Sequence, residues 1–248
     1  MASAKVASAS GCEFNLHSRE YSDFIGLDPI RGLHYRSLIS HLGDLRGKNI
    51  LDVGCGDGRF ASILASAGAA VTGYDRSEKL IRTALDRDEA KTGRVSFQVA
   101  TPESFKSGEE FDHAVSVLVL PYATDPCHLT AFFSSAFKHL RDKGNFISVI
   151  LNPDFKNFGM AIGNRFWRRV GKKVEVQFLD RAGGRAVLTA KLSQFSKGEY
   201  ERAAEKAGFA HLSWAGLSFQ PEGEQPFGSE FWAPMKKHKP YSIVIAKK

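Results

Sequence analysis

Between residues 49 and 151, short apolar segments alternate with stretches of helical periodicity, and this alternation restricts the fold more than any other feature of the sequence. Segment 114–120 is apolar at nearly every position, as a strand that is covered on both faces should be. The order strand, helix, strand, helix, strand, strand, helix, strand is typical of a doubly wound, mainly parallel α/β sheet. We expect its strands at 49–53, 70–74, 95–99, 114–120 and 146–151, a first helix at 29–42 that begins with Asp28 as N-cap, and a later helix at 125–140.

The alternation stops after residue 151. Two strand patterns, 174–179 and 185–192, flank the turn sequence 180–184, and this arrangement predicts a β-hairpin. A helix over 197–207 that ends at Gly208 and two further strands, 211–219 and 241–246, complete the expected elements.

The hairpin belongs to a segment, 152–195, that leaves the fifth strand at the carboxyl edge of the sheet. Ligands of doubly wound sheets bind beyond this edge. We therefore expect segment 152–195 to form a substrate cap inserted into a seven-stranded Rossmann-like sheet. The predicted organisation is a flexible tail over 1–15 and a single domain over 16–248.

The composition excludes several classes of protein. Hydrophobic residues make up 43% and charged residues 25% of the 248 residues, as in soluble globular proteins. No segment reaches the roughly 20 apolar residues of a membrane span, and the first twelve residues lack the apolar stretch of a secretory signal. The three cysteines, Cys12, Cys55 and Cys127, suggest neither a disulfide framework nor a zinc site. We expect a reduced, cytoplasmic protein with no membrane partner and no metal.

Positive charge is concentrated in the second half of the chain. Residues 1–150 carry a net charge of −1, whereas residues 151–248 hold 17 Lys and Arg against 9 Asp and Glu, a net charge of +8. The densest part is segment 164–173. A solvated surface, an acidic substrate or a nucleic acid each accounts for such a cluster.

A glycine-rich loop, Asp52-Val53-Gly54-Cys55-Gly56-Asp57-Gly58, follows the first predicted strand. Glycines allow a sharp turn and a close approach of the backbone to a ligand. The dinucleotide fingerprint requires glycine at position 59, which is Arg59, and the Gly-Lys-Ser/Thr ending of a P-loop is absent. The loop is therefore predicted to bind a cofactor without phosphates. S-adenosylmethionine fits, because an acidic loop accepts its cationic amino group.

The second predicted strand ends at Asp75, 21 residues after Gly54. A carboxylate at the end of that strand accepts hydrogen bonds from ribose hydroxyls. The loop and Asp75 together predict an adenosine-type cofactor.

The stretch from Asn49 to Asp75 resembles motifs I and II of the class I S-adenosylmethionine-dependent methyltransferases. Segment 111–115 resembles the fourth-strand motif of that family, and segment 140–144 its turn before the fifth strand. A finer similarity, to the toxoflavin synthase-like N-methyltransferases of azapteridine biosynthesis, is carried by Glu20-Tyr21, Leu120-Pro121-Tyr122-Ala123, Phe178-Leu179-Asp180 and Ala207-Gly208-Phe209.

The resemblance implies methyl transfer to a nitrogen of a small, planar heterocycle. In the family an acidic residue often follows the third strand, where this chain reads Ala100-Thr101-Pro102-Glu103, and Thr101 is the expected substitute. The residues predicted to bind the cofactor are Asp52, Gly54, Cys55, Gly56, Gly58, Asp75, Arg76, Thr101, Pro102 and Val117. Tyr21 and Tyr122 are the candidate catalytic residues near the methyl group, and the predicted substrate wall is Phe155, Trp167, Phe227 and Trp232.

Two alternatives remain open at this point. The first is an RNA or protein methyltransferase that docks its substrate on the basic segment 165–173. The second is a cofactor-binding subunit without activity. The main hypothesis expects a small-molecule substrate and no nucleic acid, and the sequence leaves the oligomeric state open.

Overall fold

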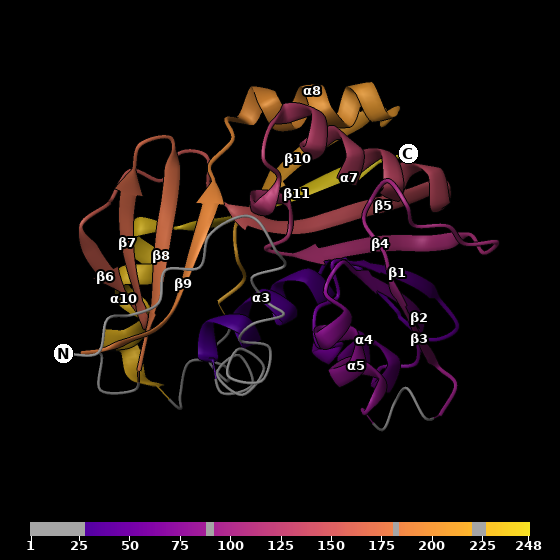
Figure 1. Ribbon diagram of the computed structural model, residues 1–248, viewed down its shortest axis with the longest axis horizontal. Coiled ribbons are helices and arrows are strands. Elements are labelled where there is room, and N and C mark those ends of the chain that lie inside the picture. Colours follow the sequence, from indigo (N-terminus) through magenta and orange to yellow (C-terminus); the bar gives the residue numbers. More distant parts are fainter. Residues whose placement is uncertain (1–27, 88–91, 181–183, 220–226) are drawn as a thin grey trace.

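The computed structural model describes residues 28–87, 92–180, 184–219 and 227–248, and its centre is a twisted sheet of seven strands (Figure 1). The strands lie in the order β10-β11-β5-β4-β1-β2-β3. Neighbours are parallel, except that β11 is antiparallel to both β10 and β5. The prediction of a mainly parallel, seven-stranded Rossmann-like sheet is confirmed. The strands are β1 (Asn49–Val53), β2 (Ala70–Asp75), β3 (Val95–Val99), β4 (Phe111–Val117), β5 (Leu140–Leu151), β10 (His211–Ala215) and β11 (Tyr241–Lys247).

Helices cover both faces of this sheet (Figure 1). On β1, Ile50 belongs to one apolar cluster, whereas Leu51 and Val53 belong to the other, because successive side chains of a strand point to opposite faces. The cluster that contains Ile50 packs under α3 (Pro29–Ile39) and α4 (Arg59–Ser66), next to α5 (Glu78–Leu85), and extends to α10 (Gly228–His238). The opposite cluster packs under α7 (Pro126–His139) and α8 (Lys197–Ala207).

The helix ends follow their capping residues. The Asp28 carboxylate accepts a hydrogen bond from the Ile30 N–H at 3.2 Å, which confirms the predicted N-cap of α3. Helix α8 spans the predicted residues, with Gly208 in the left-handed conformation as its C-cap. Helix α3 ends at Ile39, three residues earlier than its periodicity indicated.

Strands β4 and β5 differ in their bounds from the sequence-based expectation. Strand β4 begins at Phe111 rather than at 114, and β5 begins at Leu140, within the segment that was expected to form the turn before it. Strand β4 ends at Val117, because Leu118 adopts a positive φ of 59°. Residues Leu120–Tyr122 then form a turn of 3-10 helix. Helix α10, which contains Pro234, was not predicted.

Residues 160–193 form a second sheet with four antiparallel strands, which lies to one side of the central sheet (Figure 1). This sheet, called the cap sheet below, falls inside the segment predicted as a cap. The predicted hairpin is its β8–β9 pair. The first two strands were missed, because the arginine-rich sequence of β7 was interpreted as a basic surface. The strands are β6 (Met160–Ile162), β7 (Arg165–Val170), β8 (Lys173–Leu179) and β9 (Ala186–Ser193).

Among the described residues, no helix is long and apolar enough to cross a membrane. The predicted tail over 1–15 and the candidate Tyr21 lie outside the described residues.

Candidate active site

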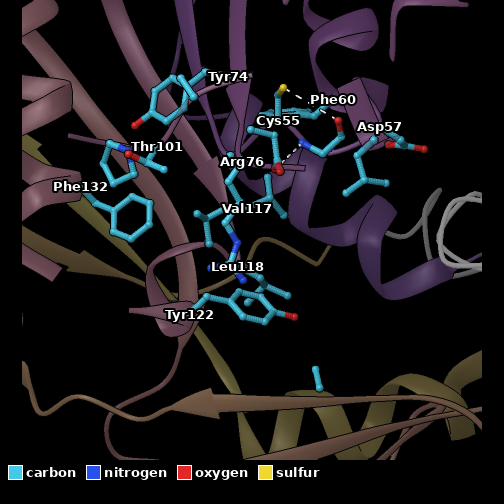
Figure 2. Close-up of a pocket in the computed structure, with 18 of the residues that line it drawn as sticks. Cys55, Asp57, Phe60, Tyr74, Arg76, Thr101, Val117, Leu118, Tyr122 and Phe132 are labelled. Atoms are coloured by element: carbon cyan, nitrogen blue, oxygen red, sulfur yellow. Dashed lines mark hydrogen bonds between the residues drawn. The ribbon is translucent and has the colours of Figure 1, made fainter. Parts of the chain in front are cut away.

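A cavity of about 290 Å³ lies at the carboxyl edge of the central sheet, where β1, β2, β3 and β4 end (Figure 2). The loops that follow these four strands line one part of it. Helices α3, α4, α5 and α7, the 3-10 turn and the cap strands β8 and β9 line the rest. Of the predicted site residues, nine line the cavity: Gly54, Cys55, Gly56, Asp75, Arg76, Thr101, Pro102, Val117 and Tyr122.

The three glycines of the loop after β1 have different roles, although all have positive φ values. A Cβ atom on Gly54 would lie 2.5 Å from the Val119 side chain, so this glycine lets the loops after β1 and β4 meet. Gly56 faces open space in the cavity. A Cβ atom on Gly58 would meet Phe97 at 2.6 Å, and Gly58 does not line the cavity. Gly58 therefore allows the loop to pack closely against β3 and α5, and does not face a ligand.

The Asp75 carboxylate joins the two predicted motifs. Its Oδ2 accepts a hydrogen bond from the Gly56 N–H at 3.0 Å, and its Oδ1 accepts one from the Ser77 N–H at 2.8 Å. Burial raises the pKa of Asp75, and these two hydrogen bonds act in the opposite direction. Each carboxylate oxygen has a second lone pair, so the group retains the capacity to accept the two hydroxyl donors of a ribose.

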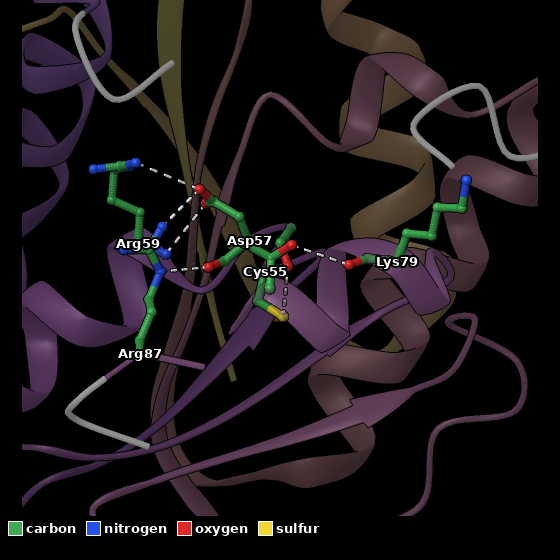
Figure 3. A network of polar contacts seen from close by, with 7 residues as sticks. Cys55, Asp57, Arg59, Lys79 and Arg87 are labelled. Atoms are coloured by element: carbon green, nitrogen blue, oxygen red, sulfur yellow. Dashed lines mark hydrogen bonds and ion pairs between the residues drawn. The ribbon is translucent and has the colours of Figure 1, made fainter. Parts of the chain in front are cut away.

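Asp57 is held by two arginines (Figure 3). Its Oδ2 lies 2.7 Å from Nη2 of Arg87 and 3.6 Å from Nη2 of Arg59. The side chain of Asp57 is 6% exposed. The negative charge of Asp57 is therefore balanced by arginine. Asp75 and Glu103, which line the cavity, and the buried Asp52 are the carboxylates left to interact with a cationic ligand.

Asp52 lies beneath the loop and does not line the cavity. The residue is buried, and its Oδ2 has no hydrogen-bond partner among the described residues. Burial, with the nearby charges of Asp75 and Asp57, raises the pKa of Asp52 to about 8. The raised pKa means that the ionised form of Asp52 is unfavourable in the empty protein, and a ligand ammonium group near the loop would stabilise that ionised form. The orphaned oxygen and the Asp75 carboxylate therefore fit the amino group and the ribose of S-adenosylmethionine.

The residues after β2, β3 and β4 form the part of the cavity that suits an adenosine moiety. Arg76, Thr101 and Val117 all lie here, as predicted. Figure 2 shows Thr101, Tyr74 and Phe132 gathered on this side. Glu103, two residues after Thr101, also lines the cavity and supplies an exposed carboxylate close to the position where the family often carries an acid.

The rest of the cavity has a mainly apolar and aromatic wall. Tyr35 of α3 stacks on Phe60 of α4 with ring centroids 4.7 Å apart. Tyr122 and Leu118 come from the turn after β4 (Figure 2). The cap sheet closes this part of the cavity with Phe178, Ala190 and Leu192, and Arg31 of α3 adds a cation that is 8% exposed.

None of the four predicted wall residues lines the cavity. Phe155 and Trp167 contact each other edge to face at 5.0 Å inside the core between the cap sheet and the central sheet. Trp232 is 1% exposed in α10, and Phe227 is 46% exposed just before that helix. We therefore correct the assignment: Phe155, Trp167 and Trp232 pack in the core, Phe227 faces outward, and the cap sheet instead contributes Phe178, Ala190 and Leu192 to the wall of the cavity.

Sequence reasoning missed the residues that helix α3 contributes. Arg31 and Tyr35 are four positions apart and therefore share one face of the helix. A cation and a phenol on one face of a helix that precedes the first strand were the available signal. Phe178, Ala190 and Leu192 carried no such signal, because alternation in a hairpin does not say which face meets a ligand.

The Cys55 thiol does not act as a nucleophile. Burial raises its pKa, and the charges of Asp52 and Asp75 add to the effect. The thiol therefore stays protonated at neutral pH. No cluster of His, Cys, Asp and Glu among the described residues could hold a metal ion.

Comparisons with known proteins identify the family of the chain. Residues 30–213 match a family described as a methyltransferase domain. The chain is 27% identical over 203 residues to the ubiquinone biosynthesis O-methyltransferase of Thiobacillus denitrificans, which covers 81% of this chain and 80% of that protein. It is 32% identical to the enzyme of the same name from Paramagnetospirillum magneticum over 129 residues, 52% of this chain and about half (51%) of that protein.

Solved structures show the same fold. The sugar N-methyltransferase KedS8 from Streptoalloteichus has a TM-score of 0.67 at 16% identity and covers 100% of this chain and 99% of its own. The S-adenosylmethionine-bound amino pentose methyltransferase CalS10 from Micromonospora echinaspora has a TM-score of 0.66 at 16% identity, with 97% and 99% covered. The predictions of an enzyme and of S-adenosylmethionine as its cofactor are confirmed. The chain belongs to the methyltransferase domain family.

Proposed function

We propose that this enzyme methylates a nitrogen of a small, planar heterocycle. The observation that carries the proposal is the shape of the cavity: the glycine loop with Asp75 lies on one side, and an aromatic and aliphatic wall lies on the other. That wall includes the Tyr35–Phe60 stack and Phe178. Aromatic walls suit a planar ring, because ring faces stack and bury apolar area together.

In the proposed reaction, separate residues would hold the cofactor and the acceptor. Gly54 and Gly56 would approach the methionine part of the cofactor, and Asp75 would bind its ribose. When bound, S-adenosylmethionine supplies an activated methyl group to a nucleophile in line with the sulfur. Phe178 and Leu192 would position the acceptor and exclude water, which accounts for most of the rate gain in such a displacement.

Tyr122 is our candidate catalytic residue at the reacting atoms, and its position on the turn after β4, where it lines the cavity, supports this choice. The wall formed by Tyr35, Phe60, Phe178, Ala190 and Leu192 holds no carboxylate and no histidine, whereas His128 of α7 lines the cavity beside Phe132. A ring nitrogen with a free lone pair needs no strong general base, so this wall is compatible with nitrogen as the methylated atom.

Methyl transfer to a hydroxyl oxygen is the second candidate. The O-methyltransferases among the relatives favour it, and so does Arg31, whose guanidinium could stabilise an ionised hydroxyl. In that case the rate should rise with pH up to the pKa of the acceptor hydroxyl. The rate on a ring nitrogen should be flat above neutral pH.

Three arginines of the basic segment have partners within the protein, although Arg168, Arg169 and Lys172 remain exposed. Arg165 is buried against Asp28, Arg168 pairs with Glu175 at 2.6 Å, and Arg169 lies over the Phe158 ring at 4.5 Å. These partners favour a small-molecule substrate over RNA or protein.

The test is turnover with S-adenosylmethionine on four acceptors: lumazine as the heterocycle, catechol, glucosamine and bulk tRNA. Release of S-adenosylhomocysteine is measured, and the methylated atom is identified by mass spectrometry. Methylation of lumazine on nitrogen supports the proposal. Turnover on catechol alone supports the oxygen alternative, and turnover on tRNA alone overturns both.

A further inference from the structure

A buried ion pair connects two walls of the cavity that are far apart in the sequence. Asp28 precedes α3, and Arg165 begins β7 in the cap sheet. The Asp28 Oδ2 atom pairs with the Arg165 guanidinium, and their side chains are 0% and 1% exposed. The Asp28 Oδ1 atom accepts from the Ile30 N–H at 3.2 Å and from the Asn164 side-chain amide at 3.4 Å.

Each partner is attached to a wall of the acceptor part of the cavity. On one side, Asp28 caps the helix that presents Arg31 and Tyr35. On the other side, Arg165 is the register partner of Phe178 on β8, and its guanidinium lies 4.4 Å from the centroid of the Phe178 ring. Phe178 itself lines the cavity.

The turn before Arg165 also packs closely on α3. Gly163 has a positive φ of 59°, and a Cβ atom there would lie 3.0 Å from Ile30 Cδ1 and 3.2 Å from Phe231 Cζ. The cap sheet is thus seated against the start of α3 by close packing as well as by charge.

Stability alone does not account for the pair. Burying two charges costs several kcal/mol per ion before their attraction is counted, and well-packed apolar residues often replace such pairs without loss of stability. Compared with an apolar contact, the pair fixes the relative orientation of the two elements that carry it, because hydrogen bonds between a guanidinium and a carboxylate are geometrically specific.

We propose that Asp28 and Arg165 are positioning residues that set the distance between the α3 wall and Phe178, and so determine which acceptors the enzyme accepts. This inference rests on the proposed function, because it assigns these walls to the acceptor. The cofactor part of the cavity, built by the loops after β1, β2 and β3, is not attached to the pair.

The experiment compares Asp28→Asn, Arg165→Met and the double variant with Arg168→Met as the matched control. Asparagine keeps the N-cap of α3. Arg168 lies on the same strand and also forms an ion pair, but it is 54% exposed. Three quantities are measured for each protein: the Kd of S-adenosylhomocysteine by calorimetry, the melting temperature, and the KM for the best of the small acceptors named above.

We expect each single variant to raise the acceptor KM about tenfold, because a tenfold change corresponds to the loss of roughly one charge-assisted hydrogen bond. The kcat and the Kd of S-adenosylhomocysteine should change little. Each single variant leaves one buried charge unpaired and should melt at a lower temperature than the wild type. The double variant leaves no buried charge unpaired, so its melting temperature should return toward that of the wild type while its acceptor KM stays raised. A KM that returns with the melting temperature, or a Kd that rises together with the KM, would show a merely structural pair and overturn the inference.

A readout without any acceptor separates this inference from the proposed function. Hydrogen exchange of the protein bound to S-adenosylhomocysteine should be faster over β7 and β8 in Asp28→Asn and unchanged over the glycine loop. Unchanged exchange over β7 and β8 overturns the inference even if the enzyme methylates lumazine. Faster exchange without turnover on any of the small acceptors refutes the proposed function and leaves the positional coupling established.

Discussion

Arg87 holds the glycine loop from outside the cavity. Its Nε donates a hydrogen bond to the Asp57 carbonyl oxygen at 2.5 Å, and its Nη2 donates one to the Asp57 carboxylate at 2.7 Å (Figure 3). Arg87 follows α5, thirty positions later in the sequence, so the conformation of the loop depends on a helix that is not part of its own strand–turn–helix unit. Cofactor affinity should therefore depend on a residue that never contacts the cofactor.

Replacing Arg87 with methionine tests this dependence. The variant loses two hydrogen bonds and leaves the Asp57 carboxylate with Arg59 at 3.6 Å. We expect the Kd of S-adenosylhomocysteine to rise about tenfold, because hydrogen bonds to charged groups contribute about 1.5–3 kcal/mol and part of the binding free energy must then order the loop. Calorimetry measures the change. Arg82→Met is the control, since Arg82 forms an exposed pair with Glu78 on the same helix, and an equal effect of both variants would contradict the prediction.

The raised pKa of Asp52 predicts a pH-dependent stability of the ligand-free protein. The unfolded carboxyl titrates near 3.9 and the folded one near 8, so between these values only the folded state holds the proton. The free energy of unfolding then falls as the pH rises through this range. Asp52→Asn cannot ionise and should become more stable than the wild type as the pH increases from about 5 to 8.

Melting temperatures from pH 5 to 9 measure this effect, and parallel curves for the two proteins would refute it. The same variant should bind S-adenosylhomocysteine more weakly, because the ligand ammonium loses its buried carboxylate partner. For the wild type, calorimetry near pH 7 in buffers of different ionisation enthalpy should show protons released on binding, since a cation above the loop favours ionised Asp52.

The central sheet and the cofactor loops could be predicted from the sequence, because each depends on local signals. Apolar runs specify buried strands, and the Gly54–Gly58 spacing with Asp75 specifies the turn and the carboxylate at neighbouring strand ends. Nine of the residues predicted at the site line the cavity for this reason.

The substrate wall could not be predicted, because it depends on long-range packing. Trp167 and Trp232 are aromatic residues in segments that were expected near the site, yet side chains of this size are also what fills a core between two sheets and a helix. Phe178 gives no local sign of its role, which arises when the cap sheet is seated on α3. The buried pair of Asp28 and Arg165 was equally invisible, since an arginine in a basic segment is usually solvated.

The different roles of two loop glycines can be separated by stability and binding. Gly58→Ala places a Cβ atom 2.6 Å from Phe97 and 2.8 Å from Ala84, so the free energy of unfolding should fall by about 1–3 kcal/mol from overpacking, in addition to the cost of its positive φ of 75°. Gly56→Ala meets nothing within 4 Å and costs about 1 kcal/mol for its positive φ. Its methyl group faces the cavity, however, and should weaken S-adenosylhomocysteine binding well beyond any loss of stability. Denaturant unfolding and calorimetry on both variants check the contrast, which a reversed order of the binding losses would contradict.

Trp232 and Phe178 allow the corrected substrate wall to be tested directly. The Trp232 ring is 1% exposed and contacts Phe231 edge to face at 4.8 Å, so Trp232→Ala should reduce the free energy of unfolding by about 3–5 kcal/mol. Its melting temperature should fall steeply, while the acceptor KM of the remaining folded enzyme stays close to that of the wild type. Phe178→Leu keeps an apolar side chain but removes the ring that lines the cavity and that the Arg165 guanidinium contacts. This variant should lose less stability than Trp232→Ala and show a raised acceptor KM, with an unchanged Kd for S-adenosylhomocysteine. Steady-state kinetics below the melting transition, together with calorimetry, measures both variants. A raised KM in Trp232→Ala together with an unaffected KM in Phe178→Leu would indicate that Trp232 of α10, and not Phe178 of the cap sheet, contacts the acceptor.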